Sequence, residues 1–302
     1  MISADLESTE MMFCCASCGI AEGGDIKLKL KECTDCDLVK YCGDKCREKH
    51  REQHSEECNK RKAELLHDKE LFTQPDETHH GECPLCFLPM PIDPQKSIFW
   101  SCCSEIICKG CDYANDMSGG GDRCPFCREP VTNREENRKK LMKRIKANDP
   151  AALTEMGQKC YDKGDYDGAL KYSIKAAEFG DMDAHHRLGF MYYKGEWCQK
   201  DEEKAMYHWE KAAIGGHSEA RHNLAAIEEK RGNNERAVKH FIISANLGLK
   251  VSMKSLWKHY SVGHITKEDL DATLRTHQAA LDAMKSEQRD AAESVQQNRC
   301  SS

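Results

Sequence analysis

The chain has 302 residues, a net charge of −6 and a pI near 6.2, so it is not a basic nucleic-acid binder overall. Its length allows two or three domains, and 39% hydrophobic and 7% aromatic content suits small modules plus a helical repeat array better than one large core. No run of about 18 apolar residues could cross a membrane. Residues 1–13, an expected disordered tail, lack the pattern of a secretory signal.

Cysteine is concentrated at one end of the chain: sixteen of the 19 Cys lie between Cys14 and Cys127. In a reducing cytoplasm or nucleus, where we expect this protein, closely paired Cys are metal ligands rather than disulfides. The change in composition predicts a domain boundary near residue 130.

The first cysteine cluster occupies residues 14–60, with ligands in pairs separated by two or three residues. A two-residue spacer lets one turn direct two thiolates at one zinc ion, and a three-residue spacer puts two ligands on one face of a helical turn. We therefore expect short helices at the later pairs and two interleaved tetrahedral sites. The candidate ligands are Cys15, Cys18, Cys33, Cys36, Cys42, Cys46, His54 and Cys58.

Residues 15–58 resemble a MYND finger, with the pattern C-x2-C, C-x2-C, C-x3-C and H-x3-C. The resemblance implies that one zinc takes the first and third pairs and that a second zinc takes the other two. Where the family usually has Trp, this chain has Arg51, which leaves peptide binding by the finger open.

Two neighbouring residues are alternatives to these ligands. Cys14 could replace Cys15, and His50 could compete with His54. The ligand spacing favours Cys15 and His54. We therefore interpret His50 as a solvated helix residue, and we expect residues 61–78 to form a polar linker helix.

The second cluster occupies residues 79–130 and contains eight Cys. It resembles an all-Cys RING finger, in which the usual His is absent and two ligands are adjacent in sequence, which requires a kinked backbone. The resemblance implies a cross-brace with the first and third pairs on one zinc and the second and fourth on another. The candidate ligands are Cys83, Cys86, Cys102, Cys103, Cys108, Cys111, Cys124 and Cys127.

A RING finger has no nucleophile of its own; the resemblance implies that it binds a ubiquitin-conjugating enzyme and positions the thioester. The residues that match the family's contacts are Leu85, Pro125 and Arg128, and an Arg can donate several hydrogen bonds at once. The same residues suit a zinc-stabilised module that only packs and binds, and a fold does not establish a function. The sequence favours neither interpretation.

Residues 131–148 are rich in Lys and Arg, and we interpret them as a solvated basic linker helix, with a nuclear signal or an acidic-partner contact as alternatives. Residues 149–262 then repeat at steps of 32, 36 and 32 residues. Each repeat is predicted to be two helices, the second ending at a Gly in the left-handed cap conformation. The recurring pairs are Met156-Gly157, Leu188-Gly189, Leu224-Ala225 and Leu256-Trp257.

The best-preserved unit, residues 184–216, resembles a Sel-one-like (Sel1-like) repeat, a relative of the tetratricopeptide repeat. The resemblance implies a curved solenoid whose concave face binds a peptide or protein. We interpret Cys160, Cys198 and the histidines of this half as packing or surface residues. Residues 263–302 are predicted to be a closing helix, capped at Thr266, and a flexible tail.

The sequence thus predicts a mainly α protein in which two small cross-braced zinc modules precede an α/α solenoid. We expect four structural zinc ions and protein partners, with no membrane and no nucleic-acid partner. The leading hypothesis is a ubiquitin ligase of the RING type, and the alternative is a non-catalytic scaffold or adaptor. A methyltransferase carrying a MYND finger is excluded, because the repeats fill the second half of the chain.

Overall fold

The structure is a computed structural model that describes residues 15–18, 29–195 and 197–300, with side chains to residue 295. It divides into two compact units, Met1–Leu71 and Phe72–Ser302. The predicted disordered tail and the alternative ligand Cys14 lie outside the described residues. Within the described residues the protein is mainly helical, as predicted, and no helix is long and apolar enough to cross a membrane.

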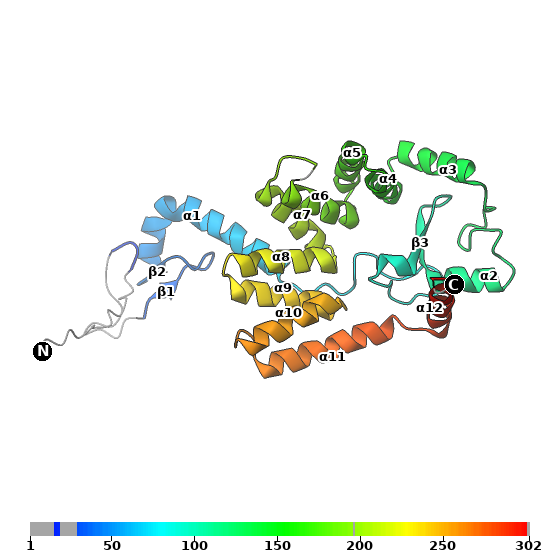
Figure 1. Ribbon diagram of the computed structural model, residues 1–302. Helices are drawn as coiled ribbons and strands as arrows, with labels where there is room; N and C mark the ends of the chain where they lie inside the picture. Colours follow the sequence, from blue (N-terminus) through cyan, green and yellow to red (C-terminus); the bar gives the residue numbers. More distant parts are fainter. Residues whose placement is uncertain (1–14, 19–28, 196, 301–302) are drawn as a thin grey trace, which may run out of the picture. The chain divides into compact units, whose positions relative to one another are not determined.

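The first unit is a small hairpin followed by one long helix (Figure 1). Strand β1 (Lys31–Glu32) pairs antiparallel with β2 (Lys40–Tyr41), and α1 runs over Asp44–Leu71. The short helices and the linker helix expected from the sequence are therefore one helix, which ends at Leu71 rather than near residue 78.

Helix α1 has almost no apolar face; only His54 and Leu71 are buried in it. Ion pairs hold it instead against the loop after β1: Arg61 donates to Asp37 at 2.7 Å, and Lys62 donates to Asp35 at 2.9 Å. Exposed pairs of this kind contribute little individually. A small apolar cluster forms around Leu30 and Tyr41, beside the cysteines of the finger.

The second unit begins with the second zinc module. After η1 (Pro94–Lys96), strands β3 (Ser97–Trp100) and β4 (Glu105–Cys108) pair antiparallel, and α2 (Lys109–Met117) follows directly. The core of the module is small, with Met90 and Ile107 as its fully buried apolar side chains beside the cysteines.

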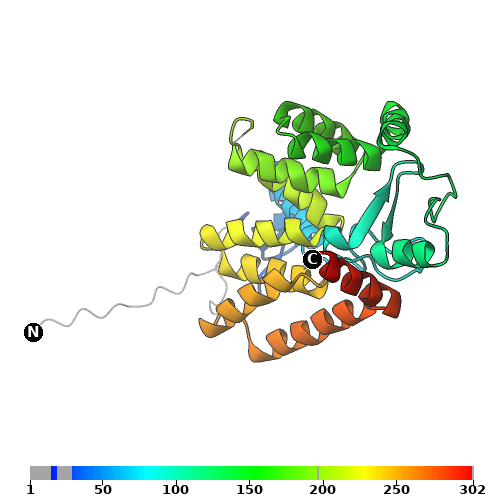
Figure 2. The ribbon, with the colours of Figure 1, turned by 45° about the vertical axis from the view of Figure 1, so that its right-hand side comes forward.

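A stack of helix pairs fills the rest of this unit (Figures 1 and 2). Its helices are α3 (Arg134–Lys146), α4 (Pro150–Asp162), α5 (Tyr166–Glu178), α6 (Met182–Lys194), α7 (Glu202–Ile214), α8 (Ser218–Lys230), α9 (Asn234–Asn246), α10 (Lys250–Ser261), α11 (Lys267–Ala283) and α12 (Glu287–Cys300). The predicted cap glycines have left-handed backbones, with φ of 79° at Gly180, 87° at Gly216 and 100° at Gly248. Ala176, Ala212, Ala213 and Ala245, near the ends of α5, α7 and α9, are fully buried, which lets neighbouring helices approach closely.

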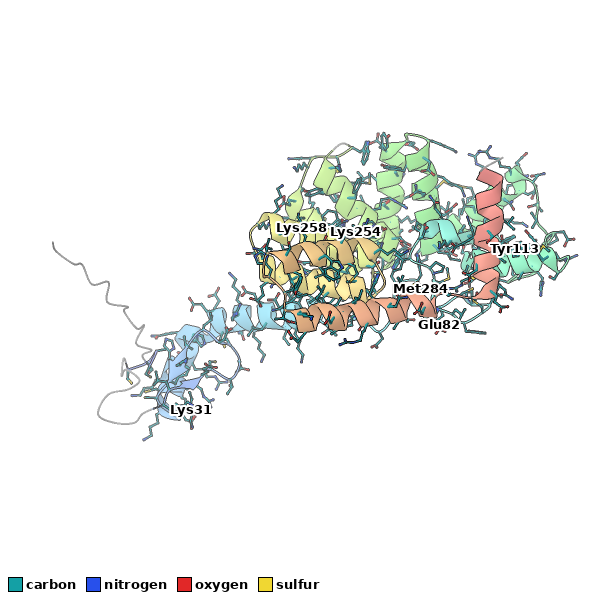
Figure 3. The ribbon with its side chains drawn as sticks, turned by 60° about the horizontal axis from the view of Figure 1, so that its bottom comes forward. Lys31, Glu82, Tyr113, Lys254, Lys258 and Met284 are labelled. Atoms are coloured by element: carbon teal, nitrogen blue, oxygen red, sulfur yellow. The ribbon has the colours of Figure 1, made fainter. Side chains whose placement is uncertain are left out.

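The C-terminal segment differs from the prediction of one closing helix and a flexible tail. Helix α11 ends at Ala283, and α12 then turns onto the second zinc module and packs against α2 (Figures 1 and 2). Met284, labelled in Figure 3 at this turn, accepts a hydrogen bond from Arg289 at 2.7 Å through its carbonyl. A Cβ at Gly110 of α2 would lie 2.9 Å from the Arg289 nitrogen, so glycine permits the contact.

Candidate metal centres

Four groups of ligating side chains gather in the two modules, and within each group the ligand atoms all lie within 4.8 Å of one another. They are the sets that the two resemblances imply. The first tetrad is Cys15, Cys18, Cys42 and Cys46; the second is Cys33, Cys36, His54 and Cys58; the third is Cys83, Cys86, Cys108 and Cys111; the fourth is Cys102, Cys103, Cys124 and Cys127.

The first tetrad joins the turn that carries Cys15 and Cys18 to the start of α1. The sulfur atoms of Cys18 and Cys42 are 3.6 Å apart, and those of Cys42 and Cys46 are 3.5 Å apart. Burial raises the pKa of Cys15, but backbone N–H groups of Cys42, Ser17 and Cys18 donate to its sulfur and bring the pKa down to about 6. The thiolate, the form that binds zinc, is thereby favoured.

The second tetrad uses the spacing of α1. His54 and Cys58 lie one turn apart on the same face of that helix and meet the turn of Cys33 and Cys36. The His54 Nε2 is 3.2 Å from the Cys36 sulfur, and the Cys33 and Cys58 sulfurs are 3.7 Å apart. His54 is buried, which is unusual for a residue of so polar a helix and consistent with its role as a ligand.

In the second module, two Cys-x2-Cys turns, here called the first and last knuckles, share one backbone geometry. They are residues 83–86 and 124–127. The Phe87 N–H donates to the Cys83 carbonyl at 2.9 Å, and the Arg128 N–H donates to the Cys124 carbonyl at 3.0 Å. Both residues that follow the knuckles are left-handed, with φ of 56° at Phe87 and 63° at Arg128. Each tight turn directs its two thiols to one side.

The third tetrad connects the first knuckle to β4 and α2. The sulfurs of Cys83 and Cys111 are 3.8 Å apart, as are those of Cys86 and Cys108. The Cys108 thiol donates a hydrogen bond to Cys83 and, with backbone N–H groups that include the one of Leu85, lowers the pKa of Cys83 to about 4 despite burial. The knuckle is thus built to hold a thiolate.

The fourth tetrad contains the adjacent ligands that were expected to need a kinked backbone. Cys102 and Cys103 lie in the turn between β3 and β4, and Ser104 after them is left-handed with a φ of 61°. Sulfur separations are 4.0 Å for Cys102 and Cys103, 3.8 Å for Cys103 and Cys124, and 3.4 Å for Cys127 and Cys102. The turn supplies the kink that lets both thiols face one ion.

These separations fit zinc and not disulfides. Zn–S bonds of about 2.3 Å at tetrahedral corners place sulfurs about 3.8 Å apart, whereas disulfide sulfurs are about 2.05 Å apart. The sulfur separations in the four tetrads run from 3.4 to 4.0 Å, and the described cysteines are free thiols. The arrangement is consistent with several zinc ions, each held by a closed four-ligand site of the structural kind.

Comparison with known families agrees with this geometry. The MYND finger family matches residues 15–58, and the Sel1 repeat family matches residues 150–181, 183–217 and 218–249. The chain carries a MYND finger and three Sel1 repeats. Its further cysteine groups, in residues 83–127, are consistent with a RING-like module.

The matches among solved structures include two repeat proteins. A Sel1 repeat protein from Oxalobacter formigenes is 25% identical, with 58% of this chain and 74% of that chain covered and a TM-score of 0.43. A protective antigen of uropathogenic Escherichia coli strains, described as displaying an SLR fold, is 22% identical, with 49% and 34% covered and a TM-score of 0.42. The comparison with curated proteins finds no match.

His50 lies on α1 and outside the tetrad, as predicted, but it is half-buried rather than fully solvated. Its Nδ1 lies 3.1 Å from the Tyr41 hydroxyl, and its ring stacks on His54 with centroids 5.7 Å apart. It therefore braces a ligand without joining the tetrad. Arg51, at the family's usual Trp position, is exposed.

The three predicted partner contacts are in different environments. Leu85 is half-buried and packs on the core of the module, Pro125 is buried, and Arg128 is exposed. Sequence reasoning missed their neighbours: Phe87 and Phe126 are the exposed apolar side chains at the knuckles, with exposed fractions of 70% and 42%. The sequence signal that could have identified them is their position: one directly follows Cys86, and the other lies inside the last knuckle.

Arg289 is a third residue that the sequence analysis missed. It is buried, and its guanidinium donates to the Pro89 carbonyl at 2.7 Å, the Leu88 carbonyl at 3.3 Å and the Cys86 sulfur at 3.5 Å. A cation beside a zinc-bound thiolate offsets part of its negative charge. No local sequence pattern predicts this contact, because about 200 residues separate Arg289 from its partners.

Proposed function

We propose that this protein is a ubiquitin-protein ligase of the RING type, in which the second zinc module recruits a conjugating enzyme while the MYND finger and the Sel1 repeats select the substrate. Each of the four tetrads would hold one structural zinc. The observation that carries the proposal is the interleaved order of the third and fourth tetrads, whose four cysteine pairs alternate along the chain.

The surface of the module supports recruitment of a protein. Phe87 and Phe126 expose apolar rings beside the two knuckles, and Arg128 is exposed next to the last ligand. Exposed aromatic and arginine side chains are enriched where proteins bind each other. The module needs no nucleophile, because the recruited enzyme carries the thioester.

The proposal is tested by ubiquitin transfer with a panel of conjugating enzymes, comparing the wild type with Arg128→Gly and Phe126→Ala. Glycine is the better replacement at residue 128, because its φ of 63° is strained for alanine. We expect both variants to keep their zinc and to lose about tenfold or more in transfer rate, as removal of one central contact costs about 1.4 kcal/mol or more.

Arg138→Ala is the matched control, because Arg138 is an exposed arginine on α3 and belongs to neither knuckle. It should transfer ubiquitin at the wild-type rate. Chain formation by wild type that survives both knuckle substitutions would contradict the assigned surface. Absence of transfer with every enzyme in the panel, from protein that holds its zinc, would reject the ligase proposal.

A specific contact favours a second candidate, a scaffold or adaptor without ligase activity. Helix α12 covers α2, and Arg289 occupies the carbonyls just after the first knuckle. Part of the module's surface is therefore already used by the chain itself. In this alternative the zinc modules and the repeats only bring proteins together, through a peptide or protein bound on the concave face of the solenoid.

The state of the thiols bears on where the protein works. Closely paired cysteines remain thiols in reducing compartments, and we propose that the protein works in the cytoplasm or the nucleus.

A further inference from the structure

A cluster of histidines lies outside the four tetrads, on the wall of a cavity of about 930 Å³. The segment leading into the second zinc module contributes His79 and His80, the first turn of α6 contributes Asp183, and the residue before α8 contributes His217. All four belong to the second unit.

The three imidazoles converge on one carboxylate. The Nε2 atoms of His79 and His217 lie 3.1 and 3.4 Å from Asp183 Oδ1, and the Nε2 of His80 lies 3.5 Å from Asp183 Oδ2. Zinc bonds of about 2.0–2.1 Å to nitrogen and oxygen place tetrahedral ligand atoms about 3.3–3.4 Å apart. The separations for His79 and His80, 3.1 and 3.5 Å, lie on either side of that value.

His217 is a positioning residue rather than a ligand. The Ala220 N–H donates to its Nδ1 at 3.3 Å, which puts the imidazole proton on Nε2, where it donates to Asp183. Its ring stacks on His79 with centroids 4.2 Å apart and planes 12° from parallel. His217 thereby orients both the carboxylate and a neighbouring imidazole.

The backbone also holds His79 in place. Its N–H donates to the Gly216 carbonyl at 3.3 Å, and a Cβ at Gly216 would lie 2.6 Å from the Glu77 carbonyl oxygen. Only glycine allows this segment to lie so close to the end of α7. The side chains that meet at Asp183 are therefore fixed by tight packing on both sides.

The ion-pair partners of the Asp183 carboxylate are imidazoles, and one imidazole nitrogen of the cluster has no hydrogen-bond partner. Among the described residues these ion-pair partners are the three histidines, with no Lys or Arg, and the nitrogen without a partner is the buried Nδ1 of His79. The Asp183 side chain is half-buried, and a carboxylate partly removed from water is stabilised by pairing with a cation or by binding a metal. Histidine and carboxylate together are ligands for zinc.

We propose that His79, His80 and Asp183 form a fifth zinc site, of two imidazoles and one carboxylate, with its remaining position open to the cavity. Three protein ligands leave one tetrahedral corner for water or for an oxygen ligand of a molecule in the cavity, unlike the closed tetrads of the two modules. The metal would also tie the segment before the second module to α6. This site is independent of the ligase proposal.

The test is the zinc content of the full chain by native mass spectrometry, after equilibration with zinc and removal of loosely bound metal. The wild type should hold five ions, and Asp183→Asn and His80→Gln should each hold four. His186→Gln is the matched control, because His186 lines the same cavity without facing Asp183 as a ligand, and it should hold five.

Cobalt substitution supplies a second readout. The four tetrads contain thiolates and give sulfur-to-cobalt charge transfer, so a fifth equivalent bound by nitrogen and oxygen should add visible absorption without further charge transfer. Four ions in the wild type would overturn the proposal. Five ions retained in both His80→Gln and Asp183→Asn would overturn it too, because the extra metal would then lie elsewhere.

Discussion

Single residues set how closely the Sel1 repeats pack. Gly189 of α6 faces Trp209 of α7, and a Cβ at residue 189 would lie 2.4 Å from the indole ring. Trp209 is buried, and its Nε1 donates to the His186 carbonyl at 3.1 Å. The indole therefore cannot move aside without losing a buried hydrogen bond.

Gly189→Ala should destabilise the second unit by about 1–3 kcal/mol, the usual cost of overpacking a core. Gly157 occupies the equivalent place one repeat earlier, but its Cβ would meet chiefly the Arg187 Nη1 at 2.9 Å, the end of a flexible side chain. Gly157→Ala is thus the matched control, with a smaller loss. Urea denaturation of both variants checks the difference; equal losses would contradict it.

The ligand residues were predictable because each pair is local: two thiols separated by two residues define a turn. The adjacent pair Cys102 and Cys103 was predictable as a kink, though not as the left-handed turn at Ser104 that produces it. His79, His80 and Asp183 carried no such signal, because 104 residues separate His79 from Asp183. Spacing rules identify ligands only within a turn or a helix.

At the scale of elements, helix α9 buries a histidine among apolar groups. His240 is 1% exposed and packs on the Phe72 ring, with centroids 4.6 Å apart. Burial, together with the positive charges of Arg221 and Arg236, lowers the pKa of His240 from 6.5 to about 3. The folded protein therefore keeps this imidazole neutral at pH values where an unfolded chain would protonate it.

The stability of the second unit should consequently fall as the pH drops below 6.5. Between pH 6.5 and the folded pKa the unfolded state binds a proton that the folded state excludes, so stability is lost as the pH falls, by about 2 kcal/mol at pH 5 for this one group. His240→Gln removes the titrating group. Urea denaturation of this variant should show a loss of unfolding free energy between pH 7 and pH 5 that is smaller than the wild-type loss by about 2 kcal/mol.

The quantity compared is the change in unfolding free energy between pH 7 and pH 5 in each protein. Any loss of zinc in acid that is common to both proteins cancels in this comparison. His67→Gln is the control, since His67 is exposed on α1, and it should keep the wild-type slope. An unchanged slope in His240→Gln would contradict the buried neutral state.

Among the elements, the repeat helices were predictable because the repeat period and the cap glycines agree from α4 to α9. Helices α1 and α12 were not predictable in extent. Both are highly polar and lack an apolar stripe, so no hydrophobic periodicity marks where they run. Metal ligands and ion pairs hold α1, and packing on α2 holds α12.

At the scale of the whole molecule, the second zinc module is part of the same compact unit as the solenoid. Helix α12 closes on α2, and Arg289 links it to the carbonyls around the first knuckle. Sequence composition suggested separate modules with linkers at 131–148 and a free tail. Whether the second module is separate from the solenoid depends on long-range contacts, which cannot be predicted from a single sequence.

Helix α12 connects the third tetrad to the helices of the solenoid. Loss of the metal from the third tetrad would release Cys86 and the carbonyls that Arg289 bridges, so the C-terminal helix would lose its partner. Because structural zinc supplies much of the folding free energy of a small module, the surfaces of both modules depend on it. The four tetrads have the closed four-ligand form of structural zinc sites, and the ligase proposal assigns the chemistry to a recruited protein.

The four zinc centres are tested most directly by measuring whether zinc protects their thiols from alkylation in the native full chain. Mass spectrometry identifies which cysteines are alkylated. The fifteen cysteines of the four tetrads should resist alkylation with zinc present and react after chelation, tetrad by tetrad. Cys160 and Cys198, which lie outside the tetrads, should label at the same rate with and without zinc. Equal labelling of the tetrad cysteines in both conditions would contradict the four zinc centres.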